Sequence, residues 1–408
     1  MDVTCFYGEN YNKSRDIRAE KLFNTFVNCE GKKPEYVFSS PGRAEILGNH
    51  TDHNHGKVMV AAVSCDILTF ASPTTDGSIT LYSEGYPPIK TTTSDSEIKK
   101  EEYGTSLALV KGVCTKLHEL GYEFGGFVAH TTSDIFKGAG VSSSAAFEDM
   151  IGNILNHIYN DGAIDNVEIA KIAQYAENVF FGKPCGLMDQ VACAVGGIVA
   201  IDFADPSAPA INKLDVDISG AGYNLCITNT GGNHADLTDD YASVPKEMKE
   251  IAAYFGKTVL RDLTEEDLVA SIPLLRAQYS DRAILRALHF FAENRRVAKQ
   301  VEALSAGDLN AFFANVIASG RSSYCYLQNV YTTKNVEEQG LSLALCLSER
   351  LLADKKAAWR VHGGGFAGTV QAFVPAAHVA SYRGAMDAAF GTGACMVLRI
   401  RPVGAIKL

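Results

Sequence analysis

A segment rich in glycine and serine, followed at once by an apolar helix pattern, constrains this chain more than any other feature. Residues 137–146 read KGAGVSSSAA, and an apolar periodic run covers 147–159. Gly138 and Gly140 can adopt backbone angles that other residues resist, and the serines favour a helix start near Ala145. Free N–H groups at a helix start favour a bound phosphate, and small residues let it approach closely. The segment predicts an anion cradle, with an ordinary serine-capped helix as the alternative.

Length and composition indicate a soluble globular protein of two domains. The 408 residues are too many for one comfortable core, and 47% are hydrophobic and 21% charged, as in ordinary globular proteins. Composition changes within 204–221, and the second half reads as mostly helical. We therefore expect an N-terminal domain over 1–215 and a C-terminal domain over 216–408.

Charge and cysteine usage narrow the classes of partner. The formal net charge of −10 argues against a sequence-independent hold on nucleic acid or on an anionic membrane. We expect neither secretion nor membrane insertion, because no signal-peptide-type segment and no run of 18 apolar residues occurs. The ten cysteines are scattered without a CxxC pair, which favours reduced, mostly buried thiols in the cytoplasm.

Hydrophobic periodicity and turn residues predict the remaining elements. Residues 40–56 are expected to form a polar loop between strands. The expected helices cover 15–29, 107–120, 166–181, 244–254, 265–272, 282–304, 309–319, 336–352 and 377–390. The expected strands cover 36–39, 58–63, 67–71, 79–82, 125–130, 195–203, 223–228, 359–362, 369–374 and 396–401.

The segment 40–56, SPGRAEILGNHTDHNHG, gathers ionisable side chains. Three interpretations are open. Its HxxHxH pattern with an aspartate offers ligands for zinc, although the interleaved Arg43 would repel a divalent ion. Mixed donors and acceptors at short range favour a site that binds a polyol. A solvated loop without a role is the third possibility.

The segment KPCGLMDQ places Asp189 after a glycine turn and beside apolar residues. A buried carboxylate needs a cation or a proton, and Arg43 is a candidate partner that cannot be deprotonated. Such a pair could orient a substrate hydroxyl and stabilise the charge that develops as a phosphoryl group leaves ATP. Glu177 and Ser144 offer the oxygen ligands that magnesium prefers beside phosphates, although either alone is more often structural.

The run GGGFAG at 363–368 fits the pattern GxGxxG, but a strand-like segment follows it where a dinucleotide fingerprint needs a helix. We predict a strand, a turn and a strand, with glycines that let the backbone approach a ligand. The phosphate-loop pattern GxxxxGK[ST] and the protein-kinase motifs are absent, so any use of ATP requires another scaffold.

Four segments together resemble the GHMP sugar-kinase family, and within it the galactokinases most closely. PGRAEILGNHTDHNHG resembles the galactokinase signature, KGAGVSSSAA the central phosphate loop, GLMDQ the segment with the catalytic aspartate, and GGGFAG the third glycine motif. The resemblance implies an α+β fold of two domains with the active site between them. The N-terminal domain would contain a left-handed βαβ crossover, and the C-terminal domain would be ferredoxin-like.

The resemblance also implies phosphorylation of the anomeric hydroxyl of galactose, with ATP and Mg²⁺. Asp189 and Arg43 would be catalytic, with Asp189 as base or as electrostatic partner. The implied sugar contacts are Asn49, His50, Asp52, Gly186 and Tyr241. The implied phosphate contacts are Gly138, Gly140, Ser142, Ser143 and Ser144, with Ser144 and Glu177 at the metal and Gly363, Gly364 and Gly365 in the third glycine motif.

Two departures from the signature leave the sugar open. Asn49 stands where the family usually has glutamate, and His53 stands where it commonly has tyrosine. A lost carboxylate at a sugar contact removes a charge-assisted hydrogen bond, typically about 1.5 to 3 kcal/mol. A kinase for N-acetylgalactosamine or arabinose and a non-catalytic sugar and ATP sensor are the alternatives. We expect a cytoplasmic monomer whose partners are a small-molecule sugar and ATP, without nucleic acid or membrane.

Overall fold

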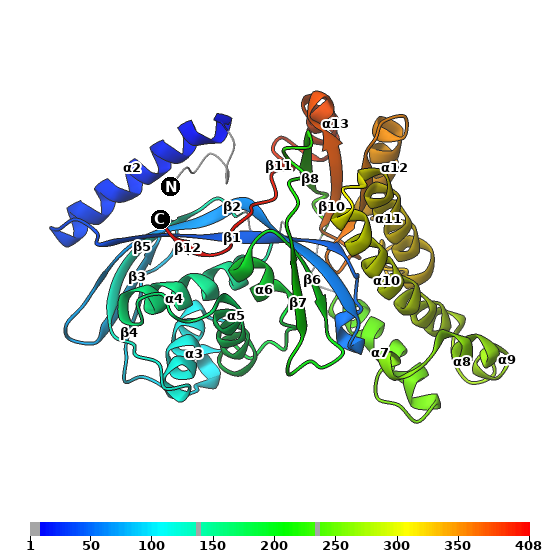
Figure 1. Cartoon of the computed structure of the whole chain (residues 1–408), viewed down its shortest axis with the longest axis horizontal. Coiled ribbons are helices and arrows are strands. Elements are labelled where there is room, and N and C mark those ends of the chain that lie inside the picture. The colour runs from blue at the N-terminus through cyan, green and yellow to red at the C-terminus, as the bar shows by residue number, and fades with distance from the viewer. Residues whose placement is uncertain (1–8, 136–139, 233–236) are drawn as a thin grey trace.

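The computed structural model describes residues 9–135, 140–232 and 237–408. Two β-sheets lie next to each other, and each is covered by helices (Figure 1). No helix in these described ranges is both long and apolar enough to cross a membrane. The nine cysteines of the described ranges are free, and five of them are buried.

Eight strands of the described residues form the first sheet, in the order β12-β1-β2-β5-β3-β4, with β6 on β2 and β7 on β6. The strands that start it are β1 (Tyr36–Leu47), β2 (Lys57–Pro73), β3 (Ser78–Ser83), β4 (Ile89–Thr92) and β5 (Phe127–Ser133). It is completed by β6 (Ile198–Asp202), β7 (Ala210–Leu214) and β12 (Ile406–Lys407). Among the described strands only β3 and β5 pair in parallel. The strand β4 and one helix connect them, and the handedness of this crossover stays a prediction.

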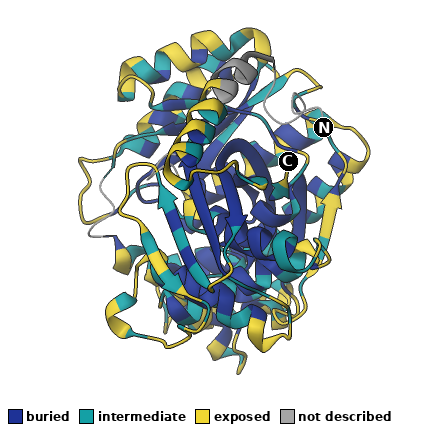
Figure 2. Cartoon of the chain, turned by 90° about the vertical axis from the view of Figure 1, so that its left-hand side faces the viewer, coloured by how far each residue is buried: buried dark blue, intermediate teal, exposed yellow. Residues whose placement is uncertain are grey.

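Helices cover both faces of the first sheet. One face carries α3 (Ser106–Glu119), α4 (Ser143–Tyr159), α5 (Asn166–Tyr175) and α6 (Met188–Val195), and the other carries α2 (Glu9–Glu30) (Figure 1). Alternate residues of β2 therefore enter different cores: Leu68 and Phe70 pack with Phe26 of α2, whereas Ile67 and Ala71 join the core under α4. Figure 2 shows the resulting sheet as a buried layer beneath helices with exposed outer sides.

The second sheet is antiparallel and has the order β11-β8-β10-β9. Its strands are β8 (Tyr223–Asn229), β9 (Ala358–His362), β10 (Thr369–Pro375) and β11 (Cys395–Leu398). Helices α7 (Thr238–Tyr254), α8 (Glu265–Ala270), α9 (Ile272–Leu275), α10 (Asp281–Ser305), α11 (Leu309–Ser322) and α12 (Gly340–Leu352) connect β8 to β9, and α13 (Val379–Phe390) connects β10 to β11. This β-helices-ββ-helix-β connectivity confirms the expected ferredoxin-like unit.

The two units share one hydrophobic core, and the C-terminal segment after β11 returns from the second unit to the first. The largest hydrophobic cluster contains Phe38 and Ile151 of the first unit together with Phe312 and Phe373 of the second. The chain then returns after β11, where Arg401, fully buried, donates a hydrogen bond to Ser39 Oγ at 2.7 Å. We propose that the boundary between the two domains lies between residues 215 and 216. The C-terminal strand β12 belongs to the first unit, because it pairs with β1.

Local patterns predicted most elements correctly, and the strand pair β1 and β2 is the main error. The expected loop over 40–56 is wrong at its start, because β1 continues to Leu47, and β2 is one long strand. A register shift between Pro41 and Arg43 lets proline and glycine lie inside the sheet. The helix α6 and the strands β4 and β7 were not predicted, because they are short or lie within turn-rich sequence. The helix expected to Phe181 changes at Ala176 into one π-helical turn.

The buried carboxyl of Asp149 on α4 gives a stability prediction. The residue has no exposed surface, neither carboxyl oxygen has a hydrogen-bond partner, and burial raises the pKa well above its ordinary value. The pKa of an aspartate in the unfolded chain is about 3.9. Because the pKa of Asp149 is higher in the folded state, its contribution to stability is fully present only below that value and is lost as the pH rises toward the folded-state pKa. Asp149→Asn should therefore raise the melting temperature relative to the unchanged protein, by a margin that grows from pH 5 to pH 7. Asp161→Asn, at an exposed turn, is the control; a margin independent of pH would contradict the assignment.

Candidate active site

A bidentate ion pair joins two segments that are far apart in the sequence. Arg43 lies on β1 beside the register shift, and Asp189 lies in the first turn of α6. Arg43 Nε is 2.7 Å from Asp189 Oδ1, and Arg43 Nη2 is 2.7 Å from Asp189 Oδ2. Ser142 Oγ also donates to Asp189 Oδ2, and Arg43 Nη1 donates to the carbonyl of Gly140. The pair predicted from sequence is therefore present and contacts the serine loop.

The surroundings of this pair keep both groups charged. Burial alone would raise the pKa of the Asp189 carboxyl, but Arg43, Ser142 and Lys183 outweigh it and hold the pKa below its ordinary value. Burial would likewise lower the pKa of Arg43, and Asp189 reverses that effect. At neutral pH the site therefore contains a fixed carboxylate and a fixed guanidinium.

A cavity of about 370 Å³ opens beside the ion pair and is lined by both units of the fold. From the first unit come Arg43, Lys183, Asp189 and the loop 140–144. From the second unit come Tyr241, His362 and the glycine turn 363–365. The cavity thus joins the phosphate-loop candidate, the ion pair and the third glycine motif, as the sequence predicted.

The serine loop has the form of an anion cradle in its described part. Gly140 and Ser142 both have positive φ, of 67° and 54°, and α4 begins at Ser143. The Ser142 side chain bonds Asp189 instead of capping α4. The N–H groups at the start of α4 are therefore available to an anion. Gly138 lies outside the described residues.

Glu177 connects the serine loop to the segment that contains Asp189. Its Oε1 is 3.4 Å from Ser144 Oγ and 2.9 Å from Lys183 Nζ, and its Oε2 accepts a hydrogen bond of 2.8 Å from Gln190. A buried carboxylate beside a hydroxyl offers oxygen ligands of the kind that Mg²⁺ prefers. Among the described residues no group of three or more His, Cys, Asp or Glu side chains could hold a metal, so the zinc interpretation gains no support.

Asn49 is a correction to the predicted sugar contacts. Its side chain has no exposed surface. The amide nitrogen donates to Glu45 Oε1 at 3.0 Å and to the Gly363 carbonyl at 2.7 Å, and the amide oxygen accepts from Asn329 and Ser323. All of its hydrogen-bonding groups are satisfied by protein, so Asn49 lies beneath the cavity.

The other predicted sugar contacts fall into two places. Tyr241 lines the cavity of the ion pair, and its hydroxyl donates to the Gly365 carbonyl at 2.8 Å. His50 Nε2 is 2.9 Å from the Gly364 carbonyl, and burial lowers the pKa of His50 to about 4, so the neutral ring donates this bond. Asp52 and Gly186 instead line a neighbouring cavity of about 310 Å³.

Four residues of the site were not predicted. Lys183 and His362 line the cavity, and Gln190 bridges Glu177 and Glu148. Asn329 contacts both Asn49 and the Gly364 carbonyl. The position of Lys183 and Gln190 within KPCGLMDQ was the only available signal, because the other contacts join distant segments.

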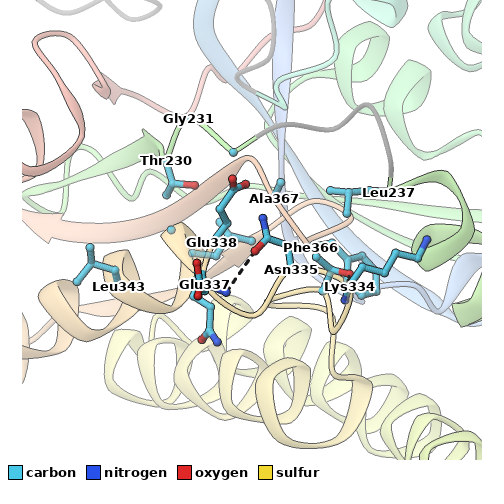
Figure 3. A pocket seen from close by; sticks show the side chains of 15 residues that line it. Thr230, Gly231, Leu237, Lys334, Asn335, Glu337, Glu338, Leu343, Phe366 and Ala367 are labelled. Atoms are coloured by element: carbon cyan, nitrogen blue, oxygen red, sulfur yellow. Dashed lines mark hydrogen bonds between the residues drawn. The ribbon is translucent and has the colours of Figure 1, made fainter.

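A larger cavity of about 840 Å³ is lined by Phe366 and Ala367, which follow the glycine turn, and by residues of other segments (Figure 3). Thr230, Leu237, Lys334 and Glu337 line it, and it shares Ala367 with the cavity of the ion pair. It contains neither the Arg43–Asp189 pair nor the start of α4. Size alone therefore does not select the candidate site, and the smaller cavity is the one that contains the predicted catalytic pair.

Comparison with known proteins agrees with this geometry. The GHMP kinases N terminal domain matches residues 108–197, and the galactokinase galactose-binding signature matches residues 24–73. A galactokinase of Streptomyces coelicolor is 31% identical over 380 residues, which are 92% of this chain and 94% of that protein. A galactokinase of Pyrococcus furiosus is 34% identical over 272 residues, 66% of this chain and 72% of that protein.

Solved structures give the same result. The crystal structure of Lactococcus lactis galactokinase complexed with galactose matches with a TM-score of 0.79 and 25% identity, over 96% of this chain and 100% of that one. A mevalonate kinase of 14% identity matches with a TM-score of 0.61 over 90% of this chain and 99% of that one. The second likeness concerns the fold alone.

The burial of Asn49 predicts the effect of placing a carboxylate there. Asn49→Glu would bring a second carboxylate beside Glu45 and would remove the donors to Glu45 and to the Gly363 carbonyl. We expect a loss of roughly 2 kcal/mol or more in stability, measured as a lower melting temperature by circular dichroism. The same exchange at Asn24, on the exposed side of α2, should leave the melting temperature unchanged. Equal melting temperatures for the two variants would show that Asn49 faces solvent.

Proposed function

This chain belongs to the galactokinase family of the GHMP kinases, and from that membership we propose that it transfers the terminal phosphoryl group of ATP to the anomeric hydroxyl of galactose. The products are galactose 1-phosphate and ADP. The observation that carries the proposal is the Arg43–Asp189 pair, in which Arg43 is buried and Asp189 partly exposed to the cavity, and which lies beside the start of α4 in that cavity. Phosphoryl transfer needs little covalent help from the protein, and positioning with electrostatic stabilisation provides most of the catalysis.

In this proposal the serine loop binds the ATP phosphates. The N–H groups at the start of α4 and the positive end of its dipole face the anion, and Gly140 lets it approach. Lys183, which lines the same cavity, adds a mobile positive charge near the phosphates. Ser142 and Ser143 lie where the loop enters the helix.

Magnesium would be held by the Ser144 hydroxyl and the Glu177 carboxylate. When bound, it would neutralise charge on the phosphate oxygens and orient them. Lys183 pairs with Glu177 at 2.9 Å, so its ammonium group lies beside the carboxylate that would hold the metal. Gln190 holds the second Glu177 oxygen in place by a hydrogen bond of 2.8 Å.

Asp189 is proposed to align the sugar hydroxyl and to balance charge. Its depressed pKa makes it a weak base. In a loose transition state the attacking hydroxyl loses its proton late, so a weakly basic carboxylate that accepts a hydrogen bond is sufficient. Arg43 would stabilise the transferring phosphoryl group, since its Nη1 reaches the serine loop at Gly140.

The sugar would lie between Tyr241 and the loop of Asp52, with His50 beneath it. A side chain at Gly186 would place its Cβ 2.8 Å from Asp52 Oδ2, so glycine keeps this carboxylate accessible. Asn49 is left out of the sugar contacts because it is buried. No feature of the cavity favours N-acetylgalactosamine, arabinose or a sensor over galactose. The free cysteines support a reducing, cytoplasmic location, and a monomer without nucleic-acid or membrane partners remains our expectation.

The catalytic role of Asp189 predicts a large loss of rate on neutralisation. Asp189→Asn keeps the shape of the side chain but removes the charge, and we expect kcat to fall by about 10²- to 10⁴-fold. A panel of free sugars with ATP and magnesium, followed by identification of the product, measures both rate and specificity. Galactose should be the preferred acceptor in the unchanged protein. A variant that retains most of its activity, or a different preferred sugar, would refute the corresponding part of the proposal.

The metal role of Glu177 predicts a changed magnesium requirement. Glu177→Gln removes the charged ligand, so the magnesium concentration for half-maximal activity should rise by about 10- to 100-fold. Glu168→Gln, at a partly exposed position in the first turn of the preceding helix α5, is the matched control and should behave like the unchanged protein. If both variants have the same magnesium dependence, Glu177 is only structural.

A further inference from the structure

Three consecutive carbonyl groups of the glycine turn are held by side chains from three other segments. Asn49 Nδ2 donates to the Gly363 carbonyl at 2.7 Å. Both His50 Nε2, at 2.9 Å, and Asn329 Nδ2, at 3.0 Å, contact the Gly364 carbonyl. The Tyr241 hydroxyl donates to the Gly365 carbonyl at 2.8 Å. The orientation of this turn is therefore set from outside the turn.

The two asparagines form the buried part of this arrangement. Asn49 and Asn329 both have no exposed surface, and Asn329 Nδ2 donates to Asn49 Oδ1 at 2.7 Å. The backbone carbonyl of Asn329 also accepts the N–H of Phe366. A Cβ at Gly365 would lie 1.9 Å from that same carbonyl, so only glycine fits there. Asn329 thus fixes the turn through its side chain and its backbone.

Peptide geometry then fixes the direction of the neighbouring N–H groups. No peptide bond of the described residues is cis, and in a trans peptide the C=O and the following N–H point in opposite directions. The Gly363 and Gly364 carbonyls point to Asn49 and Asn329, which do not line the cavity. The N–H groups of Gly364 and Gly365 therefore point toward the cavity that these glycines line.

These two N–H groups are suited to an anion. No acceptor for either is found among the described residues. Gly363 and Gly365 have positive φ, of 69° and 81°, on both sides of Gly364, and alternating backbone conformations of this kind converge successive N–H groups on one point. Arg43 and Lys183 line the same cavity. The turn therefore offers two convergent donors within a cationic cavity.

We propose that the Gly364 and Gly365 N–H groups form a phosphate subsite and that Asn49 and Asn329 are its positioning residues. The subsite would hold non-bridging oxygens of the phosphate on the sugar 1-phosphate product. The identity of that phosphate rests on the proposed function, but the presence of an anion site does not. Asn49 and Asn329 touch no ligand; they keep the carbonyls turned away, because a carbonyl in the cavity would repel the phosphate.

The test is a calorimetric titration of inorganic phosphate into the sugar-free protein. Asn329→Ala removes one of the two donors to the Gly364 carbonyl, leaves only His50 there, and removes one contact of Asn49, so the dissociation constant for phosphate should rise about tenfold or more. In the sugar assay, kcat should fall while KM for the sugar stays within about twofold. In the phosphate titration a change in the same direction is expected for His50→Phe, which removes the other donor to the Gly364 carbonyl and leaves the buried asparagines intact.

Gln328→Ala is the matched control, because Gln328 is the exposed neighbour of Asn329. It should bind phosphate like the unchanged protein. The proposal is overturned if the unchanged protein shows no saturable binding at millimolar phosphate, or if folded Asn329→Ala binds phosphate as tightly. Should Asn329→Ala fail to fold, unaltered phosphate binding by His50→Phe overturns it. A protein that makes no sugar phosphate but loses phosphate affinity in these variants would refute the proposed function and keep the subsite.

Discussion

The partly buried Arg43–Asp189 pair is the interaction on which the site depends. Taking two charges out of water is costly, and the cost is recovered only when geometry and hydrogen bonds are good. Here Nε and Nη2 of the guanidinium group each lie 2.7 Å from one carboxylate oxygen. Ser142 donates a further hydrogen bond to one of these oxygens. This geometry exists only when β1, the serine loop and the start of α6 are correctly placed relative to one another. The pair therefore fixes three segments before any ligand binds, which is the pre-organisation that electrostatic catalysis requires.

The opposite wall of the cavity belongs to the second unit, and its position depends on a shared core. Phe312 and Phe373 of the second unit pack in the same cluster as Phe38 and Ile151 of the first. Arg360 of β9, fully buried, donates to the Ile46 carbonyl of β1 at 2.9 Å. These contacts join β9 directly to the strand that carries Arg43. The glycine turn that follows β9 is consequently placed relative to Arg43 by packing and hydrogen bonds in the interior.

The sequence predicted those parts of the site that local chemistry determines. Glycines and serines before an apolar helix identified the serine loop, and GGGFAG between two apolar runs identified the turn of β9 and β10. The strand that carries Arg43 was missed, because a bulge with proline and glycine inside a doubly buried strand has no alternating pattern. The roles of Asn49 and Asn329 could not be read either. They depend on a contact across 280 residues, and no spacing rule describes such contacts.

The burial of Asn49 also gives a physical reason for the departure from the family signature. The carboxylate of this segment is at Glu45, where burial raises the pKa to about 7 while Arg360 and Arg43 act in the opposite direction. Arg360 Nη2 lies 3.2 Å from Glu45 Oε1, and Asn49 donates to the same oxygen at 3.0 Å. A glutamate at 49 would add like charge and could not donate to the Gly363 carbonyl. Asparagine, which donates to both acceptors and accepts from Asn329, matches the local electrostatics, so its presence needs no change of sugar to explain it.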